Sequence, residues 1–523
     1  MTRLLAKFAL LFGVVGAALL HPYPARAGEF AASAPVFPSR AAHEGKPNIV
    51  VILADDLGWG DLSCQPQDLS RADVAIHTPN IDRLASEGVR CTQAYATCCV
   101  CAPSRAGLLT GRSQQKFGFY EFVECEVGIP KSELLLPEFL KQRGYATACV
   151  GKWHVGYKPG FRPLDRGFDR FFGFLGGQHD YYDSRLGDPI TAMSFDYDAF
   201  VFDQEHPIRN KDMDYLTDEL TRQAVAWTTA QVQAKRPFFL YLPYNAPHPP
   251  MQATWEKLEP FAKARGGRFN SRDVARAMIQ SLDDGVGQLM ATLDRLGVAT
   301  NTLVIFTSDN GGADDGPGGE LVQHNGGLRP RKGFLWEGGI RIPFIARWPG
   351  RLPKGKVYEQ PVSHLDIFAT AVSAAGAAPP PKVLDGVDVV PYFNGDKSGR
   401  PHPTLFWGFS KAVDRWAVRH GDWKLAHDIP NAKAQADYPR GMELGLYDLA
   451  SDPHETRNLA ETHPEVVKDL TQLKDEFYGT LQPSLATPEV IKEWQRELGE
   501  RKQKLPNCDA LRRDGAPGHW NGR

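Results

Sequence analysis

Four short segments of the sequence carry side chains that could do chemistry, and each follows a run of apolar residues. They are Asp55 and Asp56 after "NIVVILA", Lys152 and His154 in "GKWH" after "YATACV", His248 in "NAPH" after "PFFLYLP", and Asp309 and Asn310 after "TLVIFTS". Carboxylate and amide oxygens suit a hard cation such as calcium or magnesium. Without a cation, three clustered carboxylates would repel one another in a cleft of low dielectric. These segments therefore predict a divalent-cation site.

The positions of these segments also argue for a common site. Ligand sites in open parallel sheets form outside the carboxyl ends of the strands. Lys152 and His154 lie two apart on an extended segment and so face the same side. Taken singly, each segment is also typical of a turn, a helix cap or a surface loop. The occurrence of complementary polar groups after four buried strands favours the site.

A further group of reactive side chains lies in "CCVCAPSRAGLLTG", Cys98 to Gly111. Pro103 suits the first turn of a helix, which places Cys101 at a helix N-terminus, where backbone N–H groups attract anions. Arg105 follows one turn later on the same face. The segment predicts a nucleophile position beside a fixed cation, with Cys98 and Cys99 as bystanders.

The elements that must position these residues alternate between strands and helices. Continuous apolar runs predict strands at residues 49–53, 145–150, 237–242, 302–308 and 342–348, and periodic segments predict helices at 78–89, 136–144, 218–233 and 273–297. This alternation predicts an α/β domain with a mostly parallel sheet over residues 47–382. After the Pro/Ala-rich segment 374–382, short alternating strands at 404–409, 415–420, 423–428 and 445–449 and a helix at 463–478 predict a smaller antiparallel α+β domain, residues 383–507.

The chain ends carry other information. A positive start with Arg3 and Lys7, an apolar run over residues 8–20 and the small residues of "ARA" predict a signal peptide over residues 1–27. A flexible leader over 28–46 and a loose tail over 508–523 are expected. We therefore expect an exported protein, periplasmic or secreted, without a membrane anchor. The net charge of -2 gives no reason to expect nucleic acid as a partner.

The chain has eight cysteines. In an oxidising compartment this number suggests disulfides, and one chemically used cysteine would leave at least one of the other seven unpaired. Zinc is disfavoured, because C-C-x-C is not a usual ligand spacing and no matching Cys/His pair follows downstream. The sequence sets neither the disulfide pattern nor the oligomeric state.

The cysteine segment resembles the signature of the type I sulfatases, C-x-P-S-R followed by a leucine pair and T-G. The resemblance extends in family order through "NIVVILADDLGWGD", "GKWHVG", "RGFDRFFGFLGG", "YNAPHPP", "TSDNGG", "KGFLWEGGIRIPFIARWPG" and "LYDLASDPHETRNLA". Cys99 is one departure, since a small residue is more usual there. The resemblance implies an alkaline-phosphatase-like sandwich, with a mixed, mostly parallel central sheet flanked by helices and a smaller C-terminal α+β domain.

The resemblance also implies a set of site residues. By analogy Asp55, Asp56, Asp309 and Asn310 bind calcium, with magnesium less favoured, together with a formylglycine formed from Cys101 by a formylglycine-generating or sulfatase-maturing enzyme. Arg105, Lys152, His154, His248 and Lys332 match the residues around the aldehyde hydrate and the sulfate. In that scheme Asp309 accepts the proton of the nucleophile, His248 with Lys332 protonates the departing alcohol, and His154 takes the last proton.

Two alternatives remain open at this point. One is a phosphonate or phosphodiester hydrolase of the same superfamily, and the other is a non-catalytic, calcium-containing glycan-binding protein with an unmodified Cys101. The implied substrate is an aryl or carbohydrate sulfate. The loops at 176–188 and 311–327 could form the pocket walls, where His179, Tyr181 and Tyr182 could either stack on a sugar or aryl ring or pack internally.

Overall fold

The structure is a computed structural model that describes residues 45–66, 75–182, 200–208, 214–313, 322–410, 415–428 and 444–504. The expected signal peptide, nearly all of the expected leader, the tail and Cys508 lie outside these residues. Within the described residues, no helix has both the length and the apolar character needed to cross a bilayer.

The main element is an eleven-stranded mixed sheet among the described residues, in the order β10-β2-β9-β8-β1-β7-β3-β4-β5-β6, with β11 also paired to β2. Its strands are β1 (Asn48–Ala54), β2 (Val89–Tyr95), β3 (Ala146–Lys152), β4 (Arg170–Phe174), β5 (Phe202–Asp203), β6 (His206–Pro207), β7 (Phe238–Pro243), β8 (Thr302–Ser308), β9 (Arg341–Arg347), β10 (Lys356–Tyr358) and β11 (Val362–Ser363). The central strands β8, β1, β7, β3 and β4 are parallel. β9 runs antiparallel to β8 and β2, and β5 antiparallel to β4. The predicted fold class is confirmed.

The five predicted strands correspond to β1, β3, β7, β8 and β9, and the predicted bounds of β8 are those observed. β2 was not predicted. Its sequence "VRCTQAY" mixes polar residues with buried ones, which is not the continuous apolar run on which the other predictions depended. The partial burial of β2 reflects its place away from the centre of the sheet.

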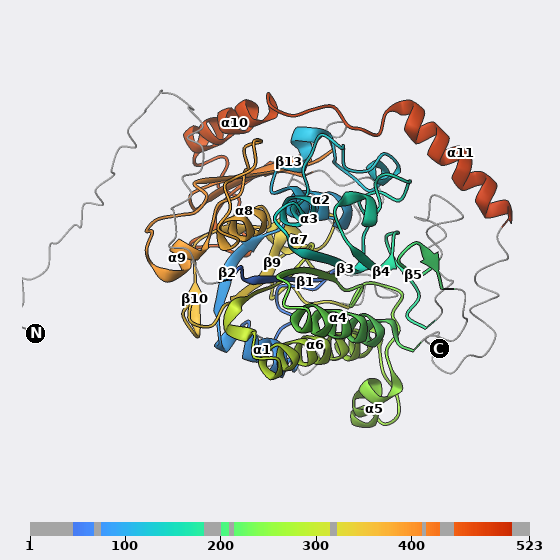
Figure 1. Cartoon of the computed structure of the whole chain (residues 1–523). Coiled ribbons are helices and arrows are strands. Elements are labelled where there is room, and N and C mark those ends of the chain that lie inside the picture. Colours follow the sequence, from blue (N-terminus) through green and yellow to red (C-terminus); the bar gives the residue numbers. More distant parts are fainter. Residues whose placement is uncertain are drawn as a thin grey trace, which may run out of the picture. The chain divides into compact units, whose positions relative to one another are not determined.

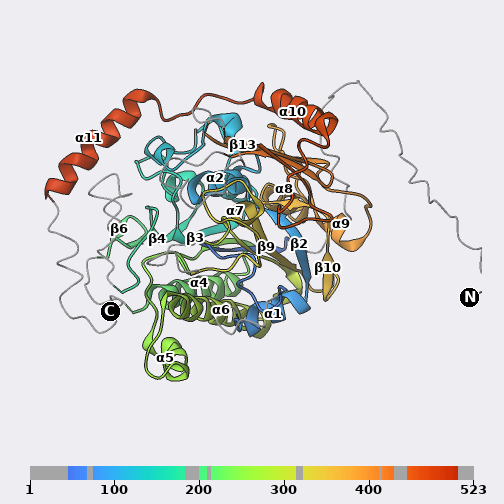
Figure 2. The same cartoon turned by 180° about the vertical axis from the view of Figure 1, so that it is seen from behind.

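Helices cover both faces of the sheet (Figures 1 and 2). One face carries α1 (Pro79–Ser86), α4 (Leu216–Gln233) and α6 (Ser271–Arg295), and the other carries α2 (Cys101–Thr110), α3 (Leu136–Lys141) and α8 (Asp366–Ala374). β1 shows why both faces need cover. Val50 and Ile52 pack with α4 and α6, whereas Ile49, Val51 and Leu53 pack with α2, α3 and α8. The predicted helices match α1, α3, α4 and α6, with small shifts at their ends.

The remaining helices are short or lie at the periphery. They are α5 (Trp255–Ala264), α7 (Glu337–Ile340), α9 (Val390–Asn394), α10 (Pro464–Tyr478), α11 (Pro488–Lys504) and the 3-10 helices at Gln114–Phe117, Val123–Glu126, Leu164–Arg166 and Ala299–Asn301.

A second, antiparallel sheet comprises β12 (Thr404–Ser410), β13 (Arg415–His420), β14 (Trp423–His427) and β15 (Leu444–Asp448). α10 packs against β13 and β14. The four strands and the helix follow the predicted elements closely, because the strands can be recognised in the sequence by alternating apolar and polar residues and by the tight turns between them. The domain boundary at residues 382 and 383 stays a prediction.

Buried charges connect this second sheet to the segment that leads into β9. Lys424 Nζ in β14 lies 3.0 Å from Glu337 Oε1 and 2.8 Å from Glu455 Oε1, and all three side chains are fully buried. The backbone N–H of Glu337 donates to Glu455 Oε2 at 2.7 Å. Burial, and then the charge of Glu337, raises the pKa of Glu455 to about 7, although Lys424 lowers it. Lys424, whose charge Glu337 shares, therefore offsets the burial of Glu455 only in part.

This network predicts a pH-dependent contribution to stability. Glu455 binds its proton more tightly in the folded protein than in the unfolded chain, so its contribution is complete below about pH 4.5 and is lost as the pH rises through about 7. We expect Glu455→Gln to remove this dependence. Relative to the wild type, its free energy of unfolding should rise by about 3 kcal/mol between pH 4.5 and pH 8.

Denaturant unfolding at a series of pH values measures this difference. Glu461→Gln, at an exposed position, is the control. A difference between Glu455→Gln and wild type that stays constant with pH would contradict the assignment.

Candidate active site

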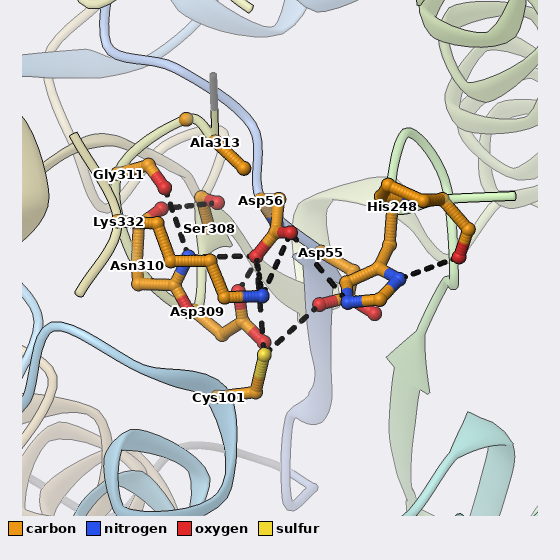
Figure 3. A network of polar contacts seen from close by, with 12 residues as sticks. Asp55, Asp56, Cys101, His248, Ser308, Asp309, Asn310, Gly311, Ala313 and Lys332 are labelled. Atoms are coloured by element: carbon orange, nitrogen blue, oxygen red, sulfur yellow. Dashed lines mark hydrogen bonds and ion pairs between the residues drawn. The ribbon is translucent and has the colours of Figure 1, made fainter. Parts of the chain in front are cut away.

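The four chemistry-bearing segments meet at one edge of the main sheet. β8, β1, β7 and β3 are consecutive parallel neighbours, so the segments that follow them emerge at the same edge. Figure 3 shows the side chains that directly follow β1 and β8 facing those of Cys101, His248 and Lys332. The convergence expected from the strand order is therefore present in the structure.

A cluster of metal-ligating atoms lies at the centre of this edge. One ligand atom each from Asp55, Asp56, Cys101 and His248 lies within 4.8 Å of the others. The backbone N–H of Asp56 donates to Asp309 Oδ1 at 3.1 Å, which brings the third carboxylate into the cluster. Oδ1 of Asn310 is buried and finds no hydrogen-bond partner in the described part of the chain. Buried oxygens without partners fit a hard cation, so these residues could hold a metal ion.

Three cations neutralise the three carboxylates. Arg105 donates from Nε and Nη2 to Asp309 Oδ2 at 2.9 and 2.8 Å. Lys152 Nζ lies 2.7 Å from Asp55 Oδ2, and Lys332 Nζ lies 2.7 Å from Asp56 Oδ1. The protein charges at the cluster therefore balance. A divalent cation would make the site positive and so attractive to an anionic ester.

Burial affects the three carboxyl groups differently. It raises the pKa of Asp55 well above the ordinary value, against the lowering effect of Lys152. At Asp309 burial acts in the same direction, but Arg105 and Lys152 outweigh it and hold the pKa well below its usual range. At Asp56 the charges of Lys332 and His248 likewise exceed the effect of burial, and the pKa is lowered.

α2 begins at Cys101, as Pro103 predicted, and ends where Gly111 takes a left-handed conformation. Every residue of the helix is buried, and Cys101 is only 4% exposed. Its Sγ lies 3.6 Å from Asp55 Oδ1 and 3.8 Å from Asp56 Oδ1. Burial, followed by the charge of Asp309, raises the pKa of this thiol. An unmodified Cys101 is therefore protonated near neutral pH and is a weak nucleophile.

The two histidines differ in their hydrogen bonds. Nδ1 of His248 lies 2.7 Å from the carbonyl oxygen of Pro249, so this nitrogen carries a proton and Nε2 faces Asp56, 3.6 Å from its Oδ2. Nδ1 of His154 is buried, and the residues described here offer it no hydrogen-bond partner. Burial lowers the pKa of both imidazoles, and at His154 Lys152 and Arg105 add to the effect. His154 is thus neutral near pH 7.

These side chains open into a cavity of about 170 Å³, here named the catalytic cavity. Its lining residues are Val100, Cys101, Ala102, Phe122, His154, Gly177, Gln178, His248 and Lys332. Gly177 and Gln178 belong to the loop that was expected to form a pocket wall. Phe122 was not predicted, because nothing in the sequence separates a cavity-lining aromatic residue from a packed one. Residues 183–188 and 314–321 of the two expected loops lie outside the described residues.

The aromatic residues considered for the pocket wall take different places. His179 and Tyr181 are buried, and Tyr181 stacks on Tyr215 with ring centroids 5.3 Å apart. The packing alternative therefore holds for these two. Tyr182 is half-buried and lines a different cavity.

The segment that carries Lys332 is held by the second sheet. Arg415 in β13 donates from Nη2 to the carbonyl oxygen of Gly333, and its Nε bonds to Asp428 Oδ1 at 2.5 Å. Asp428 Oδ2 accepts the backbone N–H of Leu335 at 2.6 Å. The Arg415–Asp428 pair thus fixes the backbone on either side of Phe334. Neither Arg415 nor Asp428 was predicted for the site, because no local sequence pattern marks the two residues as partners and they meet the Lys332 segment only when the two sheets are in contact.

Glycines allow the same segment to approach the loop that follows β8. The N–H of Gly311 donates to the carbonyl oxygen of Gly339 at 3.0 Å. A Cβ on Gly311 would lie 1.9 Å from the carbonyl oxygen of Gly338, a distance that no side chain tolerates. The N–H of Lys332 donates to the carbonyl oxygen of Gly312 at 3.0 Å. Close backbone contact therefore places the Lys332 amine over the aspartates.

Cys98 and Cys99 lie in the core between the two sheets. Both are fully buried in a cluster that includes Trp336, Trp407 and Tyr447. The carbonyl oxygen of Cys99 accepts the N–H of Gly333 at 2.8 Å. All seven cysteines in the described part of the chain are free thiols.

Comparisons with known proteins agree with this geometry. A family model described as Sulfatase matches residues 47–377, and one described as N-sulphoglucosamine sulphohydrolase, C-terminal, matches residues 330–480. The chain is 38% identical over 500 residues to N-acetylgalactosamine-6-sulfatase of Mus musculus, with 90% of each chain covered. The crystal structure of Ps i-CgsB in complex with k-i-k-neocarrahexaose has a TM-score of 0.74 and 30% identity, covering 88% of this chain and 100% of that one.

A structure of phosphonate monoester hydrolase of Agrobacterium radiobacter shares the fold, with a TM-score of 0.58 over 84% of this chain and 97% of that one. At 21% identity this likeness concerns the fold alone. The architecture and the polar edge of the sheet define an alkaline-phosphatase-like hydrolase. More narrowly, the chain belongs to the sulfatase family and is a sulfuric ester hydrolase.

The Arg415–Asp428 pair leads to a prediction about activity. Asp428→Asn keeps an oxygen that can accept the N–H of Leu335, but it removes the negative charge that pairs with Arg415. The weaker contact with Arg415 should displace Lys332. We expect kcat for 4-nitrophenyl sulfate to fall about tenfold, because a displacement of about 1 Å in an active site can cost up to about a hundredfold.

Steady-state kinetics and circular dichroism of the folded variant test this expectation. The matched control is Asp422→Asn, on the turn between β13 and β14, where the carboxylate is 41% exposed and pairs with Arg400. Full activity in a folded Asp428→Asn protein would show that the pair does not position Lys332.

Proposed function

We propose that this chain hydrolyses sulfate esters of a glycan, using Cys101 after its oxidation to formylglycine. The observation that carries the proposal is the place of Cys101, at the N-terminus of α2 in a cavity that it shares with His154, His248 and Lys332. The similarity to N-acetylgalactosamine-6-sulfatase and to a structure in complex with a carrahexaose supports a carbohydrate rather than an aryl substrate.

Two groups would complete the site. Calcium, held by Asp55, Asp56, Asp309 and Asn310, would neutralise negative charge on the sulfate oxygens. Hydrated formylglycine at position 101 would supply one hydroxyl to attack sulfur and a second hydroxyl whose deprotonation would release sulfate, whereas serine and cysteine have no such second group. Because Cys101 is 4% exposed in the folded protein, we infer that a formylglycine-generating or sulfatase-maturing enzyme acts before folding buries the segment, and before export.

The cationic side chains of the site bind and orient the sulfate. Lys152 and Lys332 place their ammonium groups on the cluster, and Arg105 holds Asp309 with two N–H donors. Arg105 and Lys152 are fully buried and Lys332 is half-buried, and ion pairs fix all three before substrate arrives, so they stabilise negative charge on the ester without reorganisation. Asp309 is the proposed acceptor for the proton of the nucleophile.

The histidines move protons at opposite ends of the reaction. In the imidazolium form, which the charges of Asp55 and Asp56 favour against burial, His248 keeps the Nδ1 proton on the carbonyl oxygen of Pro249 and donates its Nε2 proton to the departing alcohol, with Lys332 assisting. Nδ1 of His154 is the proposed acceptor of the proton lost when sulfate leaves, because it is buried and lacks a hydrogen-bond partner within the described ranges.

Matched esters test the reaction class. The mature enzyme should turn over 4-nitrophenyl sulfate and sulfated sugars well above the matching phosphate and phosphonate monoesters. Preferred turnover of the phosphonate would favour the alternative hydrolase of the same superfamily, and the absence of turnover of every ester would favour the glycan-binding alternative.

The identity of the nucleophile is open to direct measurement. Mass spectrometry of the tryptic peptide Cys91 to Arg105 should show an aldehyde at residue 101 and thiols at Cys98 and Cys99. Cys101→Ala should abolish turnover, whereas Cys98→Ala and Cys99→Ala should retain it in so far as the core stays packed. Full activity with an unmodified Cys101 would overturn the proposed nucleophile.

The metal assignment predicts the effect of removing one ligand. Asp309→Ala should lower calcium affinity and abolish turnover, because it also leaves Arg105 without its carboxylate. Calcium titration by calorimetry, alongside activity after chelation and re-addition of calcium, measures both effects. Normal turnover of the wild type in excess chelator would contradict the assignment.

The role of His248 predicts a dependence on the leaving group. His248→Ala should slow alkyl and sugar sulfates by about 100-fold or more, and 4-nitrophenyl sulfate much less, because only poor leaving groups need protonation. A series of aryl sulfates of graded phenol acidity gives the slope. Equal losses across the series would show that His248 does not protonate the leaving group.

A further inference from the structure

A second and larger cavity, of about 770 Å³, lies beside α4, α5 and α6. We name it the α5 cavity. Its lining includes Tyr182, Tyr215, Arg222, Met251, Trp255 and Phe269. α5 stands away from the sheet next to α4 and α6 in both views (Figures 1 and 2). The cavity is much larger than the catalytic cavity, and neither the metal cluster nor the catalytic side chains lie in it.

Exposed aromatic rings occur in both cavities. In the described part of the chain, four large apolar side chains are strongly exposed, and the two aromatic ones among them are Phe122 in the catalytic cavity and Trp255 in the α5 cavity. Trp255 is 58% exposed and meets Phe269 edge to face, with ring centroids 6.5 Å apart. Exposed aromatic rings in a concave site indicate a binding surface. A pyranose ring has an apolar face of C–H groups that can stack on such a ring.

Two segments of the chain lead from one cavity to the other. Gln178 and His248 line the catalytic cavity, and Tyr182 and Met251 line the α5 cavity. The three residues from His248 to Met251 span at most about 11 Å. The walls of the two cavities are thus close enough for one short oligosaccharide to reach both.

The two segments are also locked together. The hydroxyl of Tyr181 lies 2.8 Å from the carbonyl oxygen of Asn245 and 2.9 Å from that of His248. The N–H of Tyr181 donates to Gln252 Oε1 at 2.9 Å. These hydrogen bonds therefore fix the distance between the two cavities, and a fixed distance suits a ligand of defined length.

The charges of the two cavities are opposite. Within the described ranges, the charged residues that line the α5 cavity are Asp214, Asp218 and Arg222. Arg222 pairs with Asp214 at 2.9 Å, so this part of the lining has an excess of one negative charge. Among the residues that the structure describes, the charged side chain that lines the catalytic cavity is Lys332. A sulfate group is therefore favoured in the catalytic cavity and disfavoured in the α5 cavity.

From these observations we propose that the α5 cavity is a second glycan subsite, which binds an unsulfated sugar unit of the chain whose sulfate ester occupies the catalytic cavity. The proposal rests on the proposed function for the sulfated unit. Trp255 stacks on the sugar ring, and the acidic lining excludes a second sulfate. The enzyme would then prefer oligosaccharides that carry sulfate on one unit and none on the unit bound beside α5.

Kinetics with substrates of two sizes tests the proposal. The probes are 4-nitrophenyl sulfate, which fills only the catalytic cavity, and a panel of galactose- and N-acetylgalactosamine-containing oligosaccharides with one sulfated unit and neutral units otherwise. In Trp255→Ala the ratio of kcat/KM for the oligosaccharide to that for the aryl sulfate should fall about tenfold, mainly through KM. Trp255→Phe, which keeps a ring, should restore most of the ratio, and Val383→Ala, exposed elsewhere, should not change it.

Direct binding keeps the test independent of turnover. Wild-type protein should bind unsulfated oligosaccharides from a panel of galactose, N-acetylgalactosamine, glucose, N-acetylglucosamine and fucose chains in calorimetry, and Trp255→Ala should bind them about tenfold more weakly. Asp218→Asn should improve binding of chains sulfated on every unit. A wild-type protein that binds no neutral chain, or a Trp255→Ala protein that binds as tightly as wild type, would overturn the subsite. Failure of the proposed function would appear instead as absent turnover of sulfate esters by mature enzyme.

Discussion

The structure depends on the mutual neutralisation of charges that are buried at one edge of a sheet. Asp55, Asp56 and Asp309 are fully buried, and so are Arg105 and Lys152. A single buried charge without a partner costs several kcal/mol, and removing one member of a buried pair costs about 3–5 kcal/mol. The strand ends, the first turn of α2 and the segment before β9 must therefore come together as a unit. The side chains of the proposed site thus also determine how these elements pack.

Much of this arrangement could be predicted from the sequence, for identifiable physical reasons. β8 is buried on both faces, so its apolar run has no polar interruption, and Pro103 marks the first turn of α2. Parallel neighbours bring their following segments to one edge, which allowed Asp55 and Asp309 to be placed in one site before the structure was known. Sequence reasoning failed where tertiary contact decides the outcome. The Arg415–Asp428 pair and Phe122 have no local pattern, and β2 is a partly polar strand.

The crowded thiols illustrate how neighbouring residues of one type take different roles. Cys101 is the first residue of α2 and faces the carboxylates, whereas Cys98 and Cys99 face the aromatic cluster between the sheets. The core between the sheets accepts Cys98 and Cys99 because free cysteine packs as a small hydrophobic residue. Only two positions along the chain therefore separate Cys99, which packs in the core, from Cys101, the proposed site of the chemistry.

The hold of the second sheet on Lys332 bears on the order in which the enzyme is completed. Arg415 and Asp428 follow Lys332 in the chain, so they are synthesised later. A nascent or truncated chain that ends before β13 contains every proposed site residue, yet lacks the groups that hold the Lys332 segment. The family models overlap over residues 330–377, which fits a C-terminal part that is not a detachable module. Completion of the active site is consequently a late event in biosynthesis, because it waits until the chain has been made as far as Asp428.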